Sequence, residues 1–489
     1  MNNYSQTIDC EVLIVGSGAG GSTVGETLIN EGYDVLMIED GPDTSLGESI
    51  QTSIQSFKTQ WRSGGLNAAI GSPIISYAEG NCVGGGTEIN SAIMQKPPEN
   101  LIDEWQDKYQ IQNFTYAEVS KYIEKVFDRL NASYTSPPLG DPSEILKSAG
   151  KKLNWKYEEL MRAQKGNISK NPFLASSEKN AKQSMSVSLI HESKKKGLKV
   201  LPNCKLKRIV SKKKQVVSID AILNKDSSKQ LIKINPKFLF LSAGAIFTPI
   251  ILRSNKLSSY AGDALQMHPT IKILARFEKE INSHKSHVPL YAITEFMPNI
   301  RIGGSNFTPG IFAMSLAEDW ARRSEMIKDF KHYALYYAMV RGTGNGTVRS
   351  TPYLNEPIVK YQLSDQNWND IFDGLNYLTQ SMFAVGAQQV IPSINSHKGW
   401  RSRSHAIKEI QNQKIRRSDC FLSTVHLFSS CPIGENRRIN CVGNSYGKLN
   451  NYENVYIADA SIIPGSLGVN PQATVMGLSY RVADYFLNS

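Results

Sequence analysis

The amino-acid sequence predicts an α/β protein, and three observations carry this prediction. The chain has 489 residues, which suggests two or three domains with large hydrophobic cores. Residues 11–15 (EVLIV), a glycine-rich turn, a helical pattern and residues 34–38 (DVLMI) follow one another as in a parallel β-α-β unit. Further along, runs of β-branched and aromatic residues alternate with polar ones, as in the strands of a second sheet, at 270–277, 332–340 and 358–363.

Composition places the chain among soluble globular proteins. Apolar residues make up 40% and charged residues 20%, which excludes collagen-like, coiled-coil and wholly disordered chains. The formal net charge is +11, and its densest runs are 194–196 and 212–214, both beside turn-like segments. We interpret these runs as solvated faces, and the alternative is peripheral contact with an anionic partner or a membrane surface. The charge is not concentrated enough to predict a nucleic-acid partner.

Cysteine and histidine spacing argues against a metal site and against a disulfide framework. The six cysteines form no Cys-x-x-Cys pair, and the eight histidines form no His-x-x-x-His pair. Reduced thiols in the cytoplasm fit this pattern best. Residues 1–9 are polar and do not resemble a signal peptide. The longest apolar stretch, 238–252, is interrupted by polar residues and is too short to span a bilayer, so no transmembrane helix is expected.

The first glycine cluster predicts a dinucleotide site. Gly16, Gly18 and Gly21 match Gly-x-Gly-x-x-Gly between a strand and a helix, and Gly20 belongs to the same turn. Such glycines permit a tight turn, close approach of a pyrophosphate, and close packing of helix on strand. Glu39 follows the second strand, 18 residues beyond Gly21, where a carboxylate binds the adenosine ribose. An acidic residue here disfavours a 2′-phosphate and leaves FAD or NAD.

A second glycine cluster lies about 60 residues further on. Residues 82–90 read CVGGGTEIN, and three consecutive glycines allow the backbone to lie flat against a bulky ligand. Asn90 adds a hydrogen-bond donor and an acceptor. Taken alone, the segment could equally be a flexible loop.

The C-terminal region contains three candidate site groups. His426 begins HLFSSCPIG, and a strand-like run at 454–458 leads to Asp459. Next, Asn470 and Pro471 open a helical stretch, Asn470 as a natural N-cap and Pro471 as a natural first helical residue. A helix start with free N–H groups would stabilise an anion beside Asn470. A histidine is more often a loop residue than a catalyst, and the neighbouring motifs strengthen the catalytic interpretation of His426.

Taken together, these motifs resemble the glucose-methanol-choline (GMC) family of FAD-dependent oxidoreductases along nearly the whole chain. The similarity within the family is greatest to the long-chain alcohol oxidase and cholesterol oxidase-like branches. Six motifs occur in the family's order: VLIVGSGAGGS with Glu39, GNCVGGGTEINSA at 80–92, FLFLSAGAIFTPIILRS at 238–254, LQMHP at 265–269, HLFSSCPIG at 426–434, and VYIADASIIPGSLGVNPQATV at 455–475.

The resemblance implies a role for each matching residue. His426 is implied as the active-site base and Asn470 as its partner at the flavin. The residues implied to hold FAD are Gly16, Gly18, Gly20, Gly21, Glu39, Gly85, Gly86, Asn90, Ala243, Asp459, Ala460, Asn470 and Pro471. Some relatives tether FAD through a histidine just before the asparagine of the second glycine cluster. This sequence has Ile89 there, which implies non-covalent FAD.

The resemblance also implies two domains. A Rossmann-like FAD-binding domain would be built from the discontinuous segments 1–100, 176–272 and 415–489. An α+β substrate-binding domain with an antiparallel sheet would comprise 101–175 and 273–414. It would include a helix that begins near Trp368, where the apolar residues recur with helical spacing.

The implied chemistry is oxidation of an alcohol to an aldehyde or ketone. An alcohol carbon releases hydride readily only as its hydroxyl proton leaves, so a base is required, and an imidazole with a pKa near ambient pH suits that role. The electron acceptor would be O₂, a quinone or another carrier. One alternative is a family member without net substrate oxidation, of the lyase or decarboxylase type. The other is a noncatalytic basic flavoprotein.

Three further groups receive structural interpretations. His268, in Met-His-Pro-Thr, is expected to order a turn at the domain junction. Cys431 is expected to be a packing thiol. The aromatic residues at 332–340 are expected to lie mostly in a sheet core.

Overall fold

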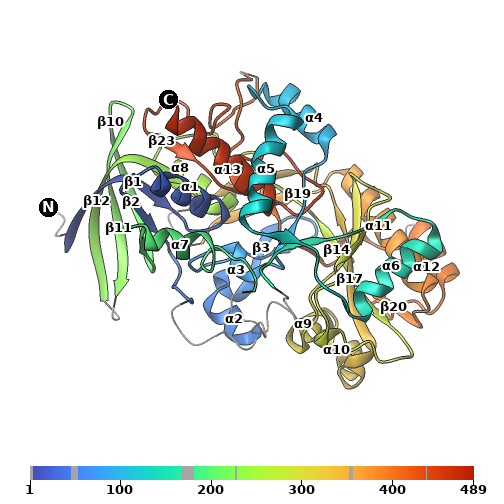
Figure 1. Ribbon diagram of the computed structural model, residues 1–489. Helices are drawn as coiled ribbons and strands as arrows, with labels where there is room; N and C mark the ends of the chain where they lie inside the picture. The colour runs from blue at the N-terminus through green and yellow to red at the C-terminus, as the bar shows by residue number, and fades with distance from the viewer. Residues whose placement is uncertain are drawn as a thin grey trace.

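Two large sheets organise the chain, each with its own buried core (Figure 1). The computed structural model describes residues 4–45, 53–166, 181–225, 228–351, 356–412, 414–436 and 438–489. Both sheets carry helices, so the predicted α/β class is confirmed.

The first sheet is the predicted nucleotide-binding unit. Its parallel strands are β1 (Gln6–Val15), β2 (Val35–Ile38), β9 (Lys199–Leu201), β12 (Ser228–Leu241) and β23 (Val455–Ile457). The antiparallel strands β10 (Cys204–Lys212) and β11 (Gln215–Lys225) extend one edge. Residues 12–15 of β1 are buried, as expected for a central strand covered on both faces. Burial of each such aliphatic side chain contributes about 1.5 to 3 kcal/mol.

Helices α1 (Ala19–Asn30) and α13 (Gln472–Leu487) pack against each other beside this sheet. Helix α7 (Leu189–Lys195) packs on α1, and α5 (Tyr116–Arg129) packs on α13. The N-terminal and C-terminal ends of the chain therefore build one lobe together, seen as blue and red ribbons in Figure 1.

The second sheet is largely antiparallel and has eleven strands within the described residues. They are β3 (Asn67–Ile70), β4 (Ile75–Tyr77), β7 (Tyr157–Glu159), β14 (Thr270–Arg276), β15 (Tyr291–Ile293), β16 (Ile300–Gly304), β17 (Tyr333–Val340), β18 (Asn345–Arg349), β19 (Ile358–Gln362), β20 (Gln389–Pro392) and β21 (Leu422–Thr424).

Helix α11 (Asp365–Ala384) packs on β14, β16 and β17 of this sheet, and α6 (Asp141–Leu153) and α12 (Arg403–Gln411) pack on α11. The strands predicted at 270–277, 332–340 and 358–363 are confirmed as β14, β17 and β19. The helix predicted near Trp368 is confirmed as α11. Most of the aromatic side chains of β17 are buried, as expected.

Shorter elements complete the fold. The helices are α2 (Ser53–Thr59), α3 (Gly86–Ile89), α4 (Glu99–Tyr109), α8 (Gly244–Ser254), α9 (Pro309–Ala317) and α10 (Trp320–Arg323). Strands β5 (Ile93–Met94), β8 (Met161–Ala163) and β6 (Ala132–Ser133) form a small sheet, and β13 (Gln266–Met267) pairs with β22 (Leu427–Phe428).

The division at 1–100, 176–272 and 415–489 against 101–175 and 273–414 stays a prediction. Its boundary between 175 and 176 lies outside the described residues. Strands β3, β4 and β21 pair into the second sheet, although their residues fall in the segments predicted for the first domain.

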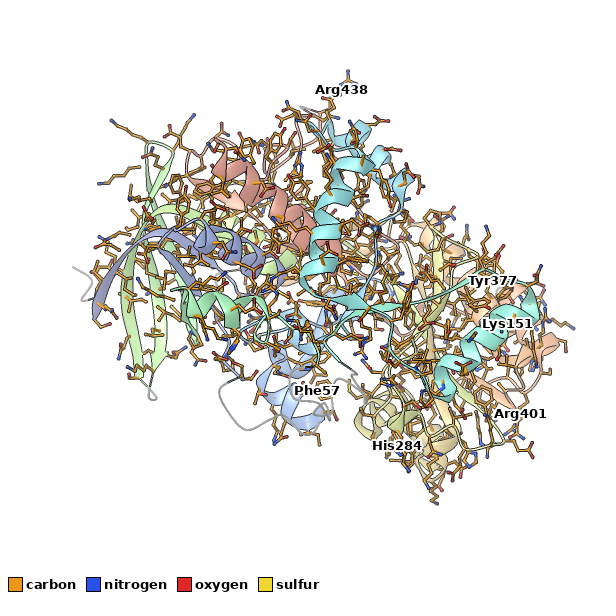
Figure 2. All side chains as sticks on the ribbon, viewed as in Figure 1. Phe57, Lys151, His284, Tyr377, Arg401 and Arg438 are labelled. Atoms are coloured by element: carbon orange, nitrogen blue, oxygen red, sulfur yellow. The ribbon has the colours of Figure 1, made fainter. Side chains whose placement is uncertain are left out.

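Side chains of the described residues project around the whole outline of both lobes (Figure 2). Lysines 194–196 and 212–214 are exposed, in agreement with their interpretation as solvated faces. No helix in the described part of the chain is long and apolar enough to cross a membrane. Within the same residues, no group of His, Cys, Asp and Glu could hold a metal ion. All six cysteines are unpaired thiols, and Cys431 is buried as expected for a packing residue.

Candidate active site

Three glycines of the first cluster are required by the packing of the chain on itself. A Cβ atom at Gly16 would lie 2.2 Å from the carbonyl oxygen of Ser242. One at Gly20 would lie 2.0 Å from the carbonyl oxygen of Ala458, and one at Gly21 would lie 2.1 Å from that of Gly16. Any side chain at these positions would collide with backbone atoms. The three glycines therefore allow the start of α1 to pack closely against the ends of β12 and β23.

Gly18 is different, because nothing in the described chain explains its lack of a side chain. A Cβ atom at Gly18, Gly86 or Gly244 would meet no atom of the described residues within 4 Å. One at Gly85 would lie 2.9 Å from the Cα of Gly18, so the two glycine clusters touch. These backbone-lined spaces, at the N-terminus of α1 and beside the second cluster, fit the phosphates of an elongated dinucleotide.

Glu39 links the two glycine clusters. One carboxylate oxygen accepts hydrogen bonds from the Ser17 amide (3.0 Å) and hydroxyl (2.8 Å), and the other accepts from the Gly41 amide (3.0 Å). The Ser17 hydroxyl oxygen in turn accepts from the Gly84 amide at 3.1 Å. Burial raises the pKa of Glu39 above its usual value. The carboxylate therefore holds the turns of the two glycine clusters together.

Asp459 is fixed in the same way at the end of β23. Its side chain accepts hydrogen bonds from the amides of Gly244 (2.9 Å) and Ser461 (2.8 Å), and from the hydroxyl of Thr248. Ala243 occupies the N-cap position of α8. The carbonyl of Ala460 accepts a hydrogen bond from the backbone N–H of Ser429, the residue after β22. These contacts place the C-terminal motif against the start of α8 and beside the open face of Gly244.

Asn90 connects the second glycine cluster to the C-terminal helix. Its side-chain amide donates to the side-chain oxygen of Gln472, the first residue of α13, at 2.6 Å. The ammonium of the partly buried Lys182 donates to the carbonyls of Glu88 (2.8 Å) and Asn90 (2.7 Å). The cluster is therefore held in place by side chains, which favours the ligand-binding interpretation over the flexible loop.

The prediction that Asn470 caps the C-terminal helix is wrong. Helix α13 begins at Gln472, Pro471 takes the N-cap position, and no side chain makes a capping hydrogen bond. The amide of Asn470 is engaged elsewhere, because its Oδ1 accepts a hydrogen bond from Nη1 of Arg301 at 2.9 Å. Its Nδ2 therefore points the other way and lies 3.3 Å from Nε2 of His426.

His426 and Asn470 thus meet beside the N-terminal end of α13. The backbone carbonyl of His426 accepts a hydrogen bond from the Thr424 hydroxyl, which fixes the turn before β22. Burial, and next the guanidinium of Arg301, lower the pKa of His426 to about 3. The imidazole is therefore neutral at physiological pH. This differs from the expected pKa near ambient pH, because the sequence alone showed neither the burial of this ring nor the guanidinium beside it.

His268 contacts His426 directly, beyond the turn-ordering role predicted from sequence. Its Nδ1 lies 3.0 Å from Nδ1 of His426, and its Nε2 accepts a hydrogen bond from the Gly468 amide at 2.8 Å. The side chain is fully buried. Burial, followed by the neighbouring His426 and Arg301, holds the pKa of His268 well below its usual value. The only advance signal was the motif LQMHP in which it occurs.

Arg301 is a site residue that the sequence did not reveal. It lies on β16, is fully buried, and has its Nη2 4.0 Å from the carboxylate of Glu158. Its Nε and Nη2 make no hydrogen bond to the described residues. An arginine between two isoleucines in a buried strand was the available signal, because charged residues are rarely fully buried without a role.

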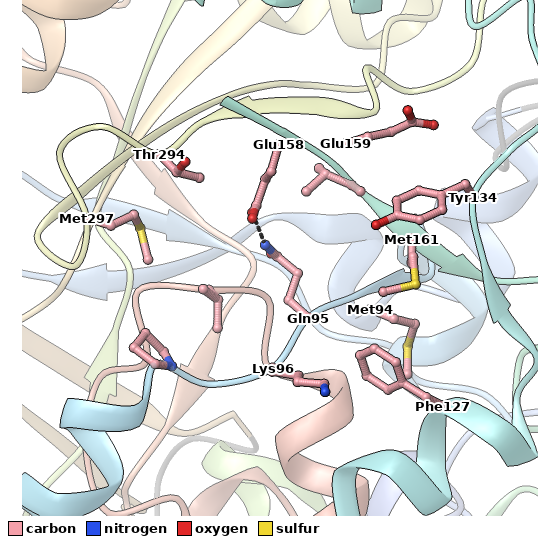
Figure 3. A pocket seen from close by; sticks show the side chains of 13 residues that line it. Met94, Gln95, Lys96, Phe127, Tyr134, Glu158, Glu159, Met161, Thr294 and Met297 are labelled. Carbon is pink, nitrogen blue, oxygen red and sulfur yellow. Dashed lines mark hydrogen bonds between the residues drawn. The ribbon is translucent and has the colours of Figure 1, made fainter. Parts of the chain in front are cut away.

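A cavity of about 350 Å³ (Figure 3) is lined by Gln95 and by Val469, the residue before Asn470 in the chain. The side chain of Gln95 accepts a hydrogen bond from the backbone N–H of Asn470 at 3.5 Å. Its side-chain nitrogen donates to the carboxylate of Glu158 at 2.7 Å. Much of the remaining wall is apolar, contributed by Met94, Phe127, Leu160, Met161, Met297 and Val469. The polar wall residues are Lys96, Glu159 and Thr294, with Tyr134 and Pro98 completing the lining.

Comparison with known families supports the interpretation of the motifs. Two family models, both described as GMC oxidoreductase, match residues 11–270 and 342–479. An uncharacterized GMC-type oxidoreductase of Sinorhizobium fredii is 41% identical over 487 residues, covering 99% of this chain and 96% of that protein. A long-chain-alcohol oxidase of Arabidopsis thaliana is 24% identical over 510 residues, covering 97% of this chain and 68% of that protein.

Solved structures share the same fold. Pyridoxine 4-oxidase from Mesorbium loti superimposes with a TM-score of 0.72 at 14% identity, covering 98% of this chain and 99% of that one. Formate oxidase from Aspergillus oryzae superimposes with a TM-score of 0.72 at 13% identity, covering 98% of both chains.

Acid should destabilise the wild-type protein more than the variant His426→Gln. The unfolded chain binds a proton on this imidazole below about pH 6.5, whereas the folded protein does so only near pH 3, so stability falls as the pH drops between these values. Between about pH 6.5 and 4.5 the contribution is on the order of 2 to 3 kcal/mol. Denaturant unfolding of both proteins across this range measures the difference. Equal losses of stability would contradict the low pKa.

Proposed function

The chain belongs to the GMC oxidoreductase family, and on that premise we propose that it oxidises a small-molecule alcohol with bound FAD, converting a CH–OH group into an aldehyde or ketone. The observation that carries this proposal is the contact between His426 and Asn470, whose Nε2 and Nδ2 atoms lie 3.3 Å apart. The electron acceptor would be O₂, a quinone or another carrier.

FAD would be held by the residues that surround the open backbone spaces. Its isoalloxazine ring supplies a hydride acceptor. The proposed contacts are Gly16, Gly18, Gly20 and Gly21 with Glu39 for the ADP part, Ala243, Asp459 and Ala460 for the central part, and Gly85, Gly86, Asn90, Asn470 and Pro471 for the flavin. We propose non-covalent binding, because Ile89 offers no atom for a tether.

His426 is the proposed base. Hydride leaves an alcohol carbon readily only when the hydroxyl proton is removed, and an imidazole nitrogen within hydrogen-bond reach performs that step. Nε2 of His426 and Nδ2 of Asn470 lie side by side, so one substrate oxygen could contact both. Arg301 holds the Asn470 amide in the orientation that presents Nδ2. The N-terminal end of α13 would favour negative charge developing nearby.

The cavity supports a substrate with an apolar body. Its methionine and phenylalanine side chains favour contact with hydrocarbon, while Gln95 and Glu158 offer polar groups (Figure 3). Of these two, Gln95 contacts the backbone N–H of Asn470. Methionines adapt to irregular shapes, so this wall accommodates more than one alcohol. We propose a cytoplasmic location on the basis of the six unpaired thiols.

The direct test of function is anaerobic mixing of the purified yellow protein with a panel of alcohols, polyols and sterols. Loss of flavin absorbance with a substrate, and its return on admission of air or a quinone, is the expected result. Product formed without any acceptor would indicate the lyase or decarboxylase alternative. A colourless protein that cannot be reconstituted with FAD would contradict the proposal.

Gly18→Val should abolish FAD retention while the chain still folds. A Cβ at this position meets no atom of the described residues within 4 Å, but branched atoms would fill the space proposed for the pyrophosphate. Flavin content after purification and thermal unfolding of the cofactor-free protein measure the two effects.

The matched comparison is Gly20→Val, in which the new side chain meets the Ala458 carbonyl, so the fold itself should be damaged. Full flavin occupancy in Gly18→Val would mean that the glycine serves only the turn.

His426→Ala should retain FAD but slow flavin reduction by an alcohol by about 10² to 10⁴, the usual contribution of a positioned acid or base. The ring lies beside Asn470 and not among the residues proposed for the ADP part, so binding of the cofactor should be preserved. Stopped-flow absorbance under anaerobic conditions measures the step. Unchanged kinetics with a confirmed substrate would exclude His426 as the base.

A further inference from the structure

His268, which is fully buried, and His426, which is partly buried, form a pair whose position is set by backbone pairing. Strands β13 and β22 are antiparallel, with Met267 opposite Leu427, so the next residues along, His268 and His426, also face each other. The His268 amide lies 3.4 Å from the His426 carbonyl, and the two Nδ1 atoms are 3.0 Å apart. We call these two residues the histidine pair.

The proton on His268 can be located from its neighbours. The amide of Gly468 can only donate, and it lies 2.8 Å from Nε2, so this nitrogen must accept and carries no proton. Burial, and after it the positive charges near the ring, lower the pKa of His268, which is therefore neutral. The groups concerned are, in order, His426, Arg301 of β16 and Arg341, which follows β17. A neutral imidazole has one proton, so it must be on Nδ1.

The proton on His426 then follows. Because Nδ1 of His268 carries a proton, it donates to Nδ1 of His426, which must accept. The single proton of neutral His426 is therefore on Nε2. This nitrogen faces Nδ2 of Asn470, whose orientation is fixed because Arg301 has no acceptor and must donate to Oδ1. Two N–H groups consequently face each other, which agrees with the length of this contact, 3.3 Å, the longest of the three.

We propose that His268 is a positioning residue that holds His426 in its Nε2–H tautomer, and that opening of the Gly468–His268 hydrogen bond converts His426 into a base. The second half rests on the proposed function. With the bond closed, His426 cannot take up a proton, because an imidazolium would turn Nδ1–H toward Nδ1–H. With the bond closed, His426 and Asn470 instead present two N–H donors to one substrate oxygen.

The conversion is balanced in protons. The Nδ1 proton of His268 moves along the existing contact to Nδ1 of His426, the Nε2 proton of His426 passes to water, and water returns a proton to Nε2 of His268. The pair stays neutral, and Nε2 of His426 becomes free to accept a hydroxyl proton. The cost is the hydrogen bond from Gly468, which lies two residues before Asn470 in the same loop. The loop that carries the substrate-binding amide would therefore also set the state of the base.

The test is the tautomer of each ring in the FAD-loaded, oxidised protein. Protein with ¹⁵N-labelled histidine is studied by long-range ¹H–¹⁵N correlation spectra, with the two rings assigned through His426→Gln and His268→Asn. The expected result is a pair of opposite tautomers, with the proton on Nδ1 in His268 and on Nε2 in His426. A proton on Nδ1 of His426, or an imidazolium at neutral pH, would overturn the proposal.

Two variants of His268 separate positioning from packing. In His268→Asn the amide nitrogen can replace Nδ1–H as donor, so His426 should keep its Nε2–H tautomer. In His268→Leu the donor is lost, so His426 should populate both tautomers and its pKa should rise toward the usual range. The same spectra recorded across pH measure both effects. An unchanged tautomer and pKa in His268→Leu would overturn the proposal, and if that variant does not fold, the wild-type spectrum decides.

These measurements need no substrate, so their outcome is independent of the alcohol assay. Opposite tautomers in a protein that oxidises no alcohol would leave the positioning role of His268 and remove the proposed function. Flavin reduction by an alcohol in a protein with Nδ1–H on His426 would support the proposed function and overturn the positioning role of His268. His268→Asn serves as the rescue variant, because a purely packing role would make it no better than His268→Leu.

Discussion

The candidate site depends on the antiparallel contact between β13 and β22, where the chain passes between the two sheets. β13 is followed closely by β14, and β21 of the same second sheet by β22, so both connections run side by side and bring His268 and His426 together. Ser429 and Ser430, just after β22, donate side-chain hydrogen bonds to the carbonyls of Ile463, in the core of the first sheet, and of Ala245, in the core of the second. A histidine placed at this crossing is fixed against both sheets, so its ring position is determined by the fold.

Sequence predicted the local parts of this arrangement well. β1, α1, β2 and Glu39 follow one another within 40 residues, and their order alone identifies a β-α-β unit because glycine, strand and helix signals are local. The strands β14, β17 and β19 and the helix α11 were also predicted from local signals, namely the spacing of apolar residues within each segment. The sequence had already marked Gly18 and Gly86 as cofactor contacts, and the structure adds the open space beside them.

The long-range parts could not be predicted in the same way. Arg301 and Asn470 are 169 residues apart in the sequence. They meet only in the folded chain, where the pairing of β16 with β17 fixes the strand that carries Arg301. That contact also explains why the N-cap prediction for Asn470 was wrong. Its flanking residues are typical of a cap, but a buried guanidinium competes for the same side-chain oxygen. A hydrogen bond to a charged group is stronger than one to a backbone amide at a helix end, so the charged partner determines the orientation.

Arg301 also changes how a base can work at this site. Burial of the ring, and next the nearby guanidinium of Arg301, lower the pKa of His426, so the imidazole remains neutral over the whole physiological range. Titration near neutral pH is then no longer the means by which the ring becomes able to accept a proton. Whether the ring can accept a proton at Nε2 then depends on which of its two nitrogens carries the single proton. The groups that hydrogen-bond to the ring determine this tautomer. Gly468 is one residue removed from the wall of the cavity at Val469, and its amide fixes the far end of the histidine pair. A ligand that shifts this loop would therefore change which nitrogen of His426 carries the proton. The change would pass through hydrogen bonds alone and would leave the net charge of the site the same.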